Sequence, residues 1–496
     1  MPYRIAVAGT DARTLLSALT ISTATSENHK ENTKGFVVRG TPGMKVFSET
    51  MNWPVEFINT EDNSAKAYAG AVSDALKNNV IDCVVPMPEK LLFEGFIDEL
   101  EDDVAEKAIG LKKDGAFIEG DKIECKRLCE DYNIPVAPQW FEVDAKDYGE
   151  VLEKTLNLIE KFGGAVLKYP YSASGKGARV VMNTWEIEEV YSRLISDYKD
   201  NYKSLRKEKW PLLIESRMSG VEISFTALLD KFGNYQILPT AMDYPERFQG
   251  PASKTNPITG GMGSISPHPM ESDELIRMAG KTIFEPFIRA LKDKNLLRPC
   301  ILYPGCFVSF DKNMKPKNIR MCEMNIRPGE PEFQPVVRRL RNLGHLIKAC
   351  VEGNLDKVKP EVRDNQIALC SCLAAGPGGE VGRNGYPWSS VRGEELQIDY
   401  KYFNKKKIQV VPSAVDYDHQ KKHFTSDGGR IAFLNMNAAF NDNKSEVASL
   451  LRQKMLSSLE NDKIKVVRAE DKGNRLQLRE DIGLQYGLAE RIFDLQ

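Results

Sequence analysis

The sequence lacks an apolar run as long as a membrane-spanning helix, and its first residues lack the basic region and cleavage site of a signal peptide. It also lacks a strong charge of either sign, with a formal net charge of −2, so we expect neither nucleic acid nor a membrane surface as a partner. Its nine cysteines form no Cys-x-x-Cys motif with histidine partners, which argues against structural zinc. These absences favour a cytoplasmic protein whose thiols are reduced and buried.

The composition is that of an ordinary globular protein, with 42% hydrophobic and 28% charged residues. At 496 residues the chain is too long for a single core. We expect an N-terminal α/β domain over residues 1–120 and a central domain over 121–360, with a small lid at about 139–206. A C-terminal α/β domain is expected over 361–496.

Hydrophobic patterns predict alternating strands and helices, which favours an open parallel sheet at the N-terminus. Expected strands there and in the lid are Tyr3–Ala8, Gly35–Val38, Ile81–Val85, Ala165–Lys168 and Ala178–Met182. Expected helices in the same regions begin at Thr14, span Ala65–Leu76, and follow a cap at Asn183 or Thr184. Beyond the lid, we expect strands at Pro211–Glu215, Glu222–Leu229, Cys306–Phe310 and Ile319–Glu323 and helices at Glu285–Leu291 and Val336–Val351.

A loop of small residues, Ser172–Gly177, connects the two predicted lid strands. Glycines let backbone N–H groups approach a phosphate, and a flexible flap can close over it, with Lys168 upstream in reach. The Gly-Lys-Ser/Thr order and spacing of a P-loop are absent. By itself the loop favours a simple hairpin turn over a nucleotide-binding flap, because Gly-rich turns between strands are common.

Acid and amide side chains alternate in the segment Glu323–Gln334. Because Glu323 and Asn325 are two apart on a predicted strand, their side chains point to the same face. Carboxylate and amide oxygens suit magnesium, and Arg327 can offset the charge of a phosphoryl group. The alternative is a polar strand end with a surface arginine.

Two further segments are compatible with substrate binding. In Leu213–Glu222 a linker between two strands can hydrogen-bond an adenine edge, and a nearby acid can hold ribose hydroxyls; the alternative is an ordinary strand–turn–strand. In Thr255–Ser264 three glycines within four residues suggest close approach of a substrate to the backbone; the alternative is a flexible surface loop.

The order and spacing of these motifs resemble glycinamide ribonucleotide synthetase (phosphoribosylamine–glycine ligase), a family of the ATP-grasp superfamily, over nearly the whole chain. The matching segments are Val84–Glu89, Gly110–Lys122, Thr259–Gly263, the run from Glu323 to Gln334, and Gly428-Gly429-Arg430. Two segments depart from the family pattern. Gly9–Leu15 keeps Gly9 and Arg13 but lacks the Glu and His that follow in the family, and Ser253–Thr259 lacks an Asp and an Asn, having Ser253 or Lys254 and Ile258 there.

The resemblance implies an α/β protein with an ATP-grasp fold, an N-terminal open parallel-sheet domain and a C-terminal mixed α/β domain. It implies ATP contacts by Lys122, Lys168, Ser174, Gly175, Gly177, Glu215, Ser216, Met218 and Glu222. It implies substrate contacts by Gly9, Arg13, Pro88, Glu89, Thr259, Gly260, Gly261, Gly263, Gly329 and Glu330. Glu323 and Asn325 would hold Mg²⁺ or Mn²⁺, and Arg327 and Lys176 would act in catalysis.

The implied activity is ATP-dependent joining of glycine to phosphoribosylamine in purine synthesis, through an acyl phosphate. The expected partners are an amino acid and a phosphorylated amine, and the expected assembly is a monomer or homodimer. The two altered segments leave open a related ligase with a different amino acid or amine, for example a modified nucleoside. They also favour an acceptor site that prefers an anion, unless Asp243, Arg247 or Asn256 compensates. The retained Glu323, Asn325 and Lys168 argue against a non-catalytic nucleotide-binding protein.

Overall fold

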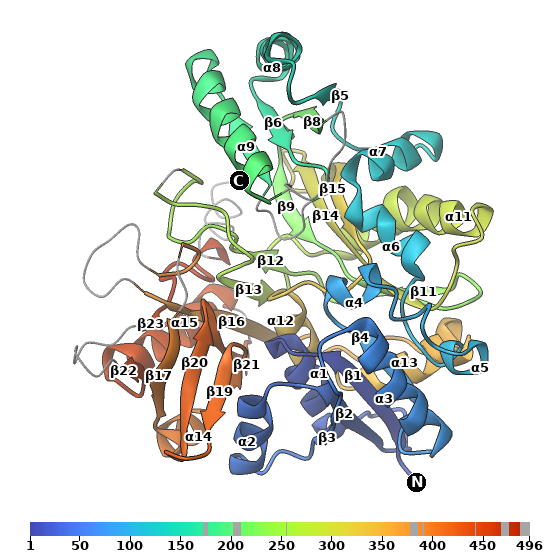
Figure 1. Ribbon diagram of the computed structural model, residues 1–496, viewed down its shortest axis with the longest axis vertical. Coiled ribbons are helices and arrows are strands. Elements are labelled where there is room, and N and C mark those ends of the chain that lie inside the picture. The colour runs from blue at the N-terminus through green and yellow to red at the C-terminus, as the bar shows by residue number, and fades with distance from the viewer. Residues whose placement is uncertain are drawn as a thin grey trace.

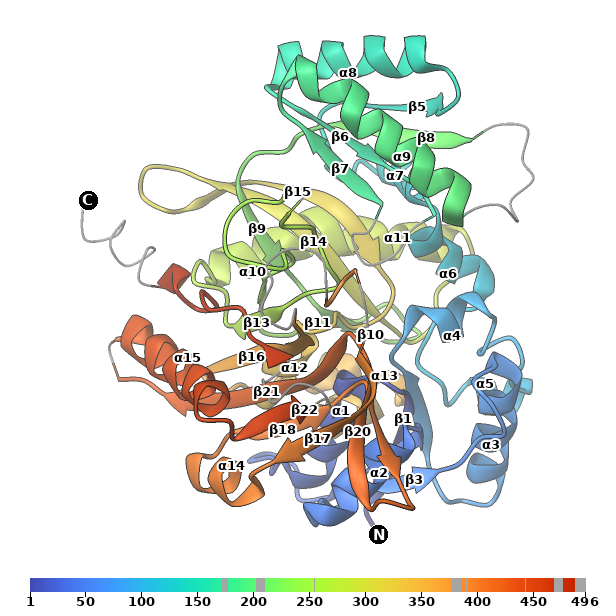
Figure 2. The same cartoon turned by 60° about the vertical axis from the view of Figure 1, so that its left-hand side comes forward.

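The computed structural model describes residues 1–171, 177–201, 210–253, 255–376, 385–388, 391–441, 443–467 and 476–486. In these residues the strands form five sheets, with the N-terminal sheet and the lid at opposite ends of the molecule (Figure 1, Figure 2). Within the same ranges no helix is both long enough and apolar enough to cross a membrane.

The N-terminal sheet is parallel, as the alternating pattern predicts, with strand order β3-β2-β1-β4. Its strands are β1 (Tyr3–Gly9), β2 (Thr33–Arg39), β3 (Glu56–Ile58) and β4 (Cys83–Pro86). The accompanying helices are α1 (Ala12–Thr23), α2 (Pro42–Thr50), α3 (Ala65–Lys77), α4 (Glu89–Phe93), α5 (Asp102–Ala105), α6 (Lys113–Gly120) and α7 (Lys122–Asp131). Side chains alternate along β1, so that Ala6 and Ala8 pack in one core and Ile5 and Val7 in another. The sheet is therefore buried on both faces, which is typical of parallel sheets.

The lid sheet has the order β5-β8-β6-β7. Its elements are β5 (Trp140–Asp144), α8 (Tyr148–Phe162), β6 (Ala165–Lys168), β7 (Ala178–Val181), a 3₁₀ turn (Thr184–Glu186), α9 (Ile187–Asn201) and β8 (Pro211–Ser216). Asn183 caps the turn in a reciprocal capping box with Glu186. Because β8 pairs with both β5 and β6, the lid sheet extends beyond the expected boundary at residue 206.

The central sheet is antiparallel, with order β11-β10-β14-β15 and with β9 also paired to β14. Its elements are β9 (Val221–Ser224), β10 (Ala227–Leu229), β11 (Tyr235–Ile237), α10 (Asp273–Ala279), a π-helical turn (Gly280–Phe284), α11 (Glu285–Asp293), β14 (Cys300–Phe310) and β15 (Pro316–Asn325). The single strand expected over Glu222–Leu229 is wrong, because the structure divides it. The pairs Ser224–Gly305 and Ala227–Leu302 share one register, but Pro304 between them has no N–H to donate.

The single helix expected over Val336–Val351 is also wrong. Two helices, α12 (Phe333–Arg338) and α13 (Leu343–Glu352), replace it. Between them the Arg341 N–H donates to the Glu361 carbonyl at 2.9 Å, and the Arg339 carbonyl accepts from the Arg363 N–H at 2.8 Å. These extended contacts with residues 361–363 take the backbone groups that a continuous helix would have used.

Two antiparallel sheets make up the C-terminal part. The first has the order β12-β13-β16-β21-β18, with β23 on β16, and the second has the order β19-β20-β17-β22. Their strands are β12 (Met242–Asp243), β13 (Gly263–Ser266), β16 (Gln366–Ala375), β17 (Val391–Ile398), β18 (Gln409–Pro412), β19 (Val415–Asp418), β20 (His423–Gly428), β21 (Arg430–Ala439), β22 (Ile464–Val467) and β23 (Leu476–Gln477). The remaining helices are a 3₁₀ turn (Leu355–Lys357), α14 (Tyr400–Lys406) and α15 (Lys444–Glu460). Because β13 pairs with β16, the Thr259–Gly263 loop is joined to the C-terminal sheet.

Candidate functional site

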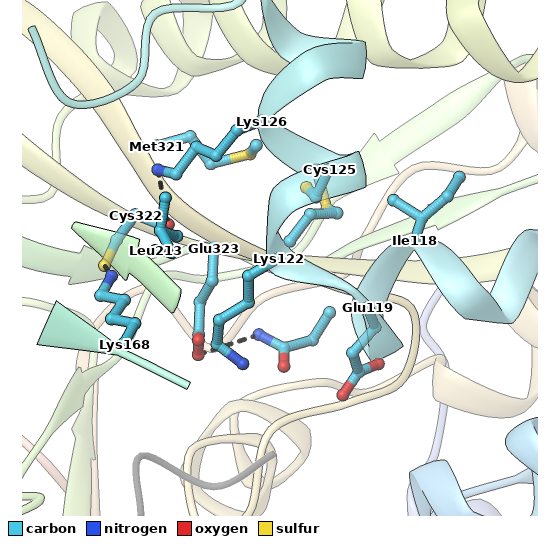
Figure 3. A pocket seen from close by; sticks show the side chains of 12 residues that line it. Ile118, Glu119, Lys122, Cys125, Lys126, Lys168, Leu213, Met321, Cys322 and Glu323 are labelled. Atoms are coloured by element: carbon cyan, nitrogen blue, oxygen red, sulfur yellow. Dashed lines mark hydrogen bonds between the residues drawn. The ribbon is translucent and has the colours of Figure 1, made fainter. Parts of the chain in front are cut away.

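A pocket lies where α6, α7, β6, β8 and β15 meet (Figure 3). It is lined by Ile118, Glu119, Lys122, Cys125, Lys126, Lys168, Leu213, Met321, Cys322, Glu323, Met324 and Asn325. Four residues expected at an ATP–metal site, Lys122, Lys168, Glu323 and Asn325, thus come together from three separate segments of the chain.

A β-bulge shapes the metal side of this pocket. Gly305 pairs with Glu323 whereas Cys306 pairs with Met321, so Cys322 is an extra residue in β15. As a result Cys322 and Glu323, although adjacent, both line the pocket, and the Lys168 Nζ donates to the Cys322 Sγ at 3.3 Å. Sequence alternation alone places these two side chains on opposite faces, and no sequence signal indicated the bulge.

Glu323 is the acid best placed to hold a cation in the pocket. Burial raises its pKa, but Lys122 and Lys168 outweigh that effect, so the pKa lies below its ordinary value and the carboxylate is ionised at neutral pH. The Asn325 amide donates to the Tyr303 carbonyl at 3.1 Å and to the Glu323 carboxylate at 3.4 Å. An ionised carboxylate beside an amide oxygen fits Mg²⁺ or Mn²⁺, which take few protein oxygens and complete their shell with phosphate and water.

Glu215 lies behind the pocket and is paired with two lysines. Its carboxylate is 2.9 Å from the Lys126 Nζ and accepts a hydrogen bond from Lys168. Burial raises the pKa of Glu215, but Lys126 and Lys168 lower it to about 2. Glu215 was expected to contact ATP. The structure places it where it holds Lys168, the lysine expected to bind the phosphates. Lys126 was not anticipated, although its position four residues after Lys122 places both on one face of α7.

The rest of the nucleotide-binding prediction lies around the lid. Ser216 leaves β8 with its N–H bonded to the Gln139 carbonyl at 2.8 Å, and Met218 is buried in the linker that follows. Glu222 is the second residue of β9, where desolvation of its carboxyl group, followed by Glu323 and Glu246, raises its pKa to about 7. Gly177 accepts from the Tyr169 N–H at 2.9 Å. Ser174, Gly175 and Lys176 lie outside the described residues.

Arg327 connects the metal side to the N-terminal domain. Its Nε lies 3.1 Å from Glu119 and 3.4 Å from Glu89, and its Nη2 donates to the Asn325 Oδ1 at 3.3 Å. Glu119 also accepts from the Ile326 N–H at 2.8 Å. Burial lowers the pKa of Arg327, but the opposite effect of Glu119 and Glu89 is larger. The pKa of Arg327 therefore lies above its ordinary value. Glu119, missed as a site residue from the sequence, therefore fixes both the backbone and the side chain at Arg327.

Replacing Glu119 with Gln is expected to lower kcat by about 10- to 100-fold, as for outer partners of metal sites, while the KM for ATP changes little. The change removes the charge that orients Arg327 but keeps Lys122 and Lys168, the lysines expected to bind ATP. Steady-state kinetics measure the effect, with Asp114→Asn, an exposed acid on the same helix, as the control. An unchanged kcat in a folded E119Q variant would contradict the positioning role.

The residues expected at the acceptor substrate lie next to Arg327. The buried Arg13 pairs with Asp11 at 2.9 Å, Glu330 at 3.7 Å and Glu89 at 3.8 Å, and its N–H donates to Glu330 at 3.0 Å. Gly9 packs against Pro88, where an added Cβ would lie 2.9 Å from the proline ring. Burial and then Asp11 raise the pKa of Glu330 to about 7, although Arg13 opposes them. The structure thus brings Gly9, Arg13, Pro88, Glu89 and Glu330 together.

The Thr259–Gly263 loop contacts this region through Arg430, which donates to the carbonyls of Gly260, Gly261 and Glu330. Thr259 is buried, and its hydroxyl donates to the Pro245 carbonyl at 2.9 Å. Protein atoms occupy the space beside the glycines: a Cβ on Gly263 would lie 2.6 Å from the Cys370 carbonyl, and one on Gly260 3.3 Å from Arg430. Close packing therefore accounts for these glycines.

Comparison with known proteins gives the same family as the motifs. Residues 120–333 match a family described as phosphoribosylglycinamide synthetase, ATP-grasp (A) domain. A phosphoribosylamine–glycine ligase from Rhodopirellula baltica is 29% identical over 327 residues, covering 66% of this chain and 69% of that protein. One from Salmonella typhi is 30% identical over 326 residues, covering 64% of this chain and 68% of that protein.

The fold agrees as well. The crystal structure of phosphoribosylamine–glycine ligase from Thermotoga maritima matches with a TM-score of 0.67 at 19% identity, covering 97% of this chain and 100% of that one. The matched ATP-grasp segment includes Lys122, Lys168 and the Glu323–Asn325 pair, which the structure gathers in one pocket. The chain belongs to the phosphoribosylamine–glycine ligase family and has the ATP-grasp fold.

Proposed function

We infer that this chain is an ATP-dependent carboxylate–amine ligase that joins glycine to phosphoribosylamine in purine synthesis. The observation that carries this inference is the direct connection of two sites by Arg327. On one side, its Nη2 donates to Asn325 in the pocket with Glu323; on the other, it pairs with Glu89 beside Arg13. A phosphoryl-transfer site and a binding site for a second substrate are thus adjacent, as a two-step ligation requires.

In the first step a carboxylate oxygen of glycine attacks the γ-phosphorus of ATP, and ADP leaves. In the second, the amine attacks the carbonyl carbon of the acyl phosphate, inorganic phosphate leaves, and the nitrogen loses a proton. Lys122 and Lys168 hold phosphate oxygens, and Arg327 offsets charge on the acyl phosphate, where preorganised donors act most strongly. We propose that Lys176 and the Ser174–Gly177 loop complete the phosphate contacts, and that the lid keeps water from the acyl phosphate.

Glu323 and Asn325 would hold Mg²⁺ or Mn²⁺. A cation bound there supplies positive charge to the phosphate oxygens. We propose that the nucleoside is contacted by Ser216, Met218 and Glu222. We propose that the phosphorylated amine is contacted by the Thr259–Gly263 loop and by Gly9, Arg13, Pro88, Glu89, Gly329 and Glu330. We propose three domains as expected from the sequence, with the lid continued through β8 to Ser216.

Phosphate release is the decisive measurement. With ATP and Mg²⁺, we expect turnover to require both glycine and phosphoribosylamine, with KM values between about 1 μM and 1 mM, as is usual for an enzyme acting on its own substrates. A panel of other amino acids, amines and modified nucleosides serves as the comparison. Turnover with another pair and none with glycine and phosphoribosylamine would overturn the substrate assignment.

A further inference from the structure

Two carboxylates near the pocket have oxygens without a hydrogen-bond partner. Glu332, just before α12, is only 7% exposed; Tyr303 donates to its Oε1, while its Oε2 is buried and unpartnered. Asp243, on β12, has a buried Oδ1 that is likewise unpartnered. Leaving a buried acceptor unsatisfied costs free energy, and among the described residues neither acid takes part in an ion pair. The structure therefore keeps two carboxylate oxygens available to a ligand.

The packing of two glycines brings the segments that carry the two acids close together. A Cβ on Gly261 would overlap the ring of Pro331, which precedes Glu332, and would lie 3.1 Å from the Asp243 Oδ1. A Cβ on Gly329 would lie 2.8 Å from the Glu332 Oε2. The Tyr303 hydroxyl, which donates to Glu332, also lies 3.2 Å from the Ser224 Oγ and fixes that carboxylate from the other side. Two glycines and a tyrosine thus hold these acids in position.

The electrostatics of the pair favour a cation. Burial raises the pKa of Asp243 well above its ordinary value, and Glu332 and then Glu222 raise it further. Glu323 and Glu332 are both among the charges that raise the pKa of Glu222. In the part of the chain that the structure describes, no group of three or more His, Cys, Asp and Glu side chains could hold a metal ion. An ammonium group, with three N–H donors, suits separated carboxylate oxygens better.

We propose that Asp243 and Glu332 bind the α-ammonium group of the amino-acid substrate, an inference that rests on the proposed ligase function. In this proposal the carboxylate of the same amino acid lies toward Arg327 and is phosphorylated there. Arg327 and Glu332 belong to one segment, Arg327–Glu332, that passes from β15 into α12. In Figure 1, β12 and β13 lie next to each other at one edge of the first C-terminal sheet, with α12 close to β13.

This assignment also decides between the alternatives that the altered loop left open. Asn256 uses its side chain within the loop, accepting from the Phe248 N–H and donating to carbonyls at 3.1–3.2 Å. Arg247 is 1% exposed and donates to the Tyr386 carbonyl and to Gln477. Of the three candidates, only Asp243 has a free acceptor, and Lys254 lies outside the described residues. The acid needed for an ammonium group therefore comes from β12.

The test uses Asp243→Asn and Glu332→Gln, with Glu246→Gln as the control. Glu246 is a nearby acid that is already paired with Arg479 at 3.1 Å. Its replacement changes the charge by the same amount, but it removes no carboxylate proposed to bind the ammonium group. Each Asn or Gln variant is expected to raise the KM for glycine by about 10- to 100-fold, the effect of losing one charge-assisted hydrogen bond, with the KM for ATP within about 2-fold. Calorimetry with glycine, and with glycolate, in which a hydroxyl replaces the ammonium group, gives a second measurement. The wild type should prefer glycine, and D243N should lose that preference.

The outcomes separate this inference from the proposed function. If the wild type turns over glycine but folded D243N and E332Q keep its KM and its preference over glycolate, the ammonium site is wrong and the ligase function stands. A raised Mg²⁺ requirement with an unchanged KM for glycine would also overturn it. If the wild type neither binds glycine nor turns it over, the proposed function itself fails. Thermal unfolding of each variant checks that it is folded, and D243N leaves the Tyr303–Glu332 hydrogen bond in place.

Discussion

Replacing Glu323 with Ala or Gln is expected to lower kcat for ATP turnover by about 100- to 1,000-fold, the usual cost of removing one group that stabilises developing charge. The reason is that Glu323 is the ionised acid of the pocket, with Lys122 and Lys168 lowering its pKa. Its loss removes the negative charge that a divalent cation needs and leaves Lys122 and Lys168 without this carboxylate. Steady-state phosphate release over a range of Mg²⁺ concentrations measures the effect.

The Gln variant is the sharper form of this experiment, because it keeps the side-chain volume and the hydrogen bond to Asn325. Glu352→Gln, at the exposed end of α13, is the matched control and should leave kcat and the Mg²⁺ dependence unchanged. Turnover like that of the wild type in E323Q would show that the cation is held elsewhere. A normal unfolding transition in the inactive variant separates a lost ligand from a lost fold.

Replacing Glu215 with Ala is expected to lower the free energy of unfolding by about 3–5 kcal/mol, the usual cost of removing one partner from a buried ion pair. Glu215 is 1% exposed, and the side chains of Lys126 and Lys168 that pair with it are only 4% and 7% exposed. Without the carboxylate two positive charges remain buried together. Urea unfolding followed by tryptophan fluorescence measures the loss.

Stability should respond to pH in a direction that the pKa of Glu215 fixes. Its pKa falls from an ordinary value of 4.5 to about 2 in the folded state, so its contribution is fully present above the higher value. That contribution is lost as the pH falls from about 4.5 towards 2. The difference in unfolding free energy between wild type and Glu215→Gln should therefore be constant above about pH 5 and shrink below it.

A double variant, Glu215→Leu with Lys126→Met, provides the control for Glu215. Because it removes one buried charge of each sign, it should recover part of the stability that the Ala variant loses. Wild-type stability in Glu215→Ala at neutral pH would contradict a structural role for the carboxylate. Loss of ATP binding without loss of stability would instead support the direct nucleotide contact expected from the sequence.

The sequence by itself determined the local elements and the motifs that identify the family. Ala165–Lys168 has the bounds of β6, and the two-residue spacing of Glu323 and Asn325 places them on one side of β15. Both follow from short-range rules, because strand periodicity and the small set of allowed backbone conformations act within a few residues. The order of the motifs was also sufficient to predict the ATP-grasp fold, because that order can be read from the sequence alone.

Only the tertiary structure decided which charges meet. Glu215 pairs with Lys126 and Lys168, and Glu332 raises the pKa of Asp243, although these residues are far apart in sequence. The bulge at Cys322, the division between α12 and α13, and the packing of Gly261 also depend on neighbours from other segments. The physical reason is that burial and charge pairing depend on distances in the folded core, and one sequence pattern serves both a surface side chain and a buried one. The sequence therefore supplied the groups, and packing decided which of them remain available to a substrate.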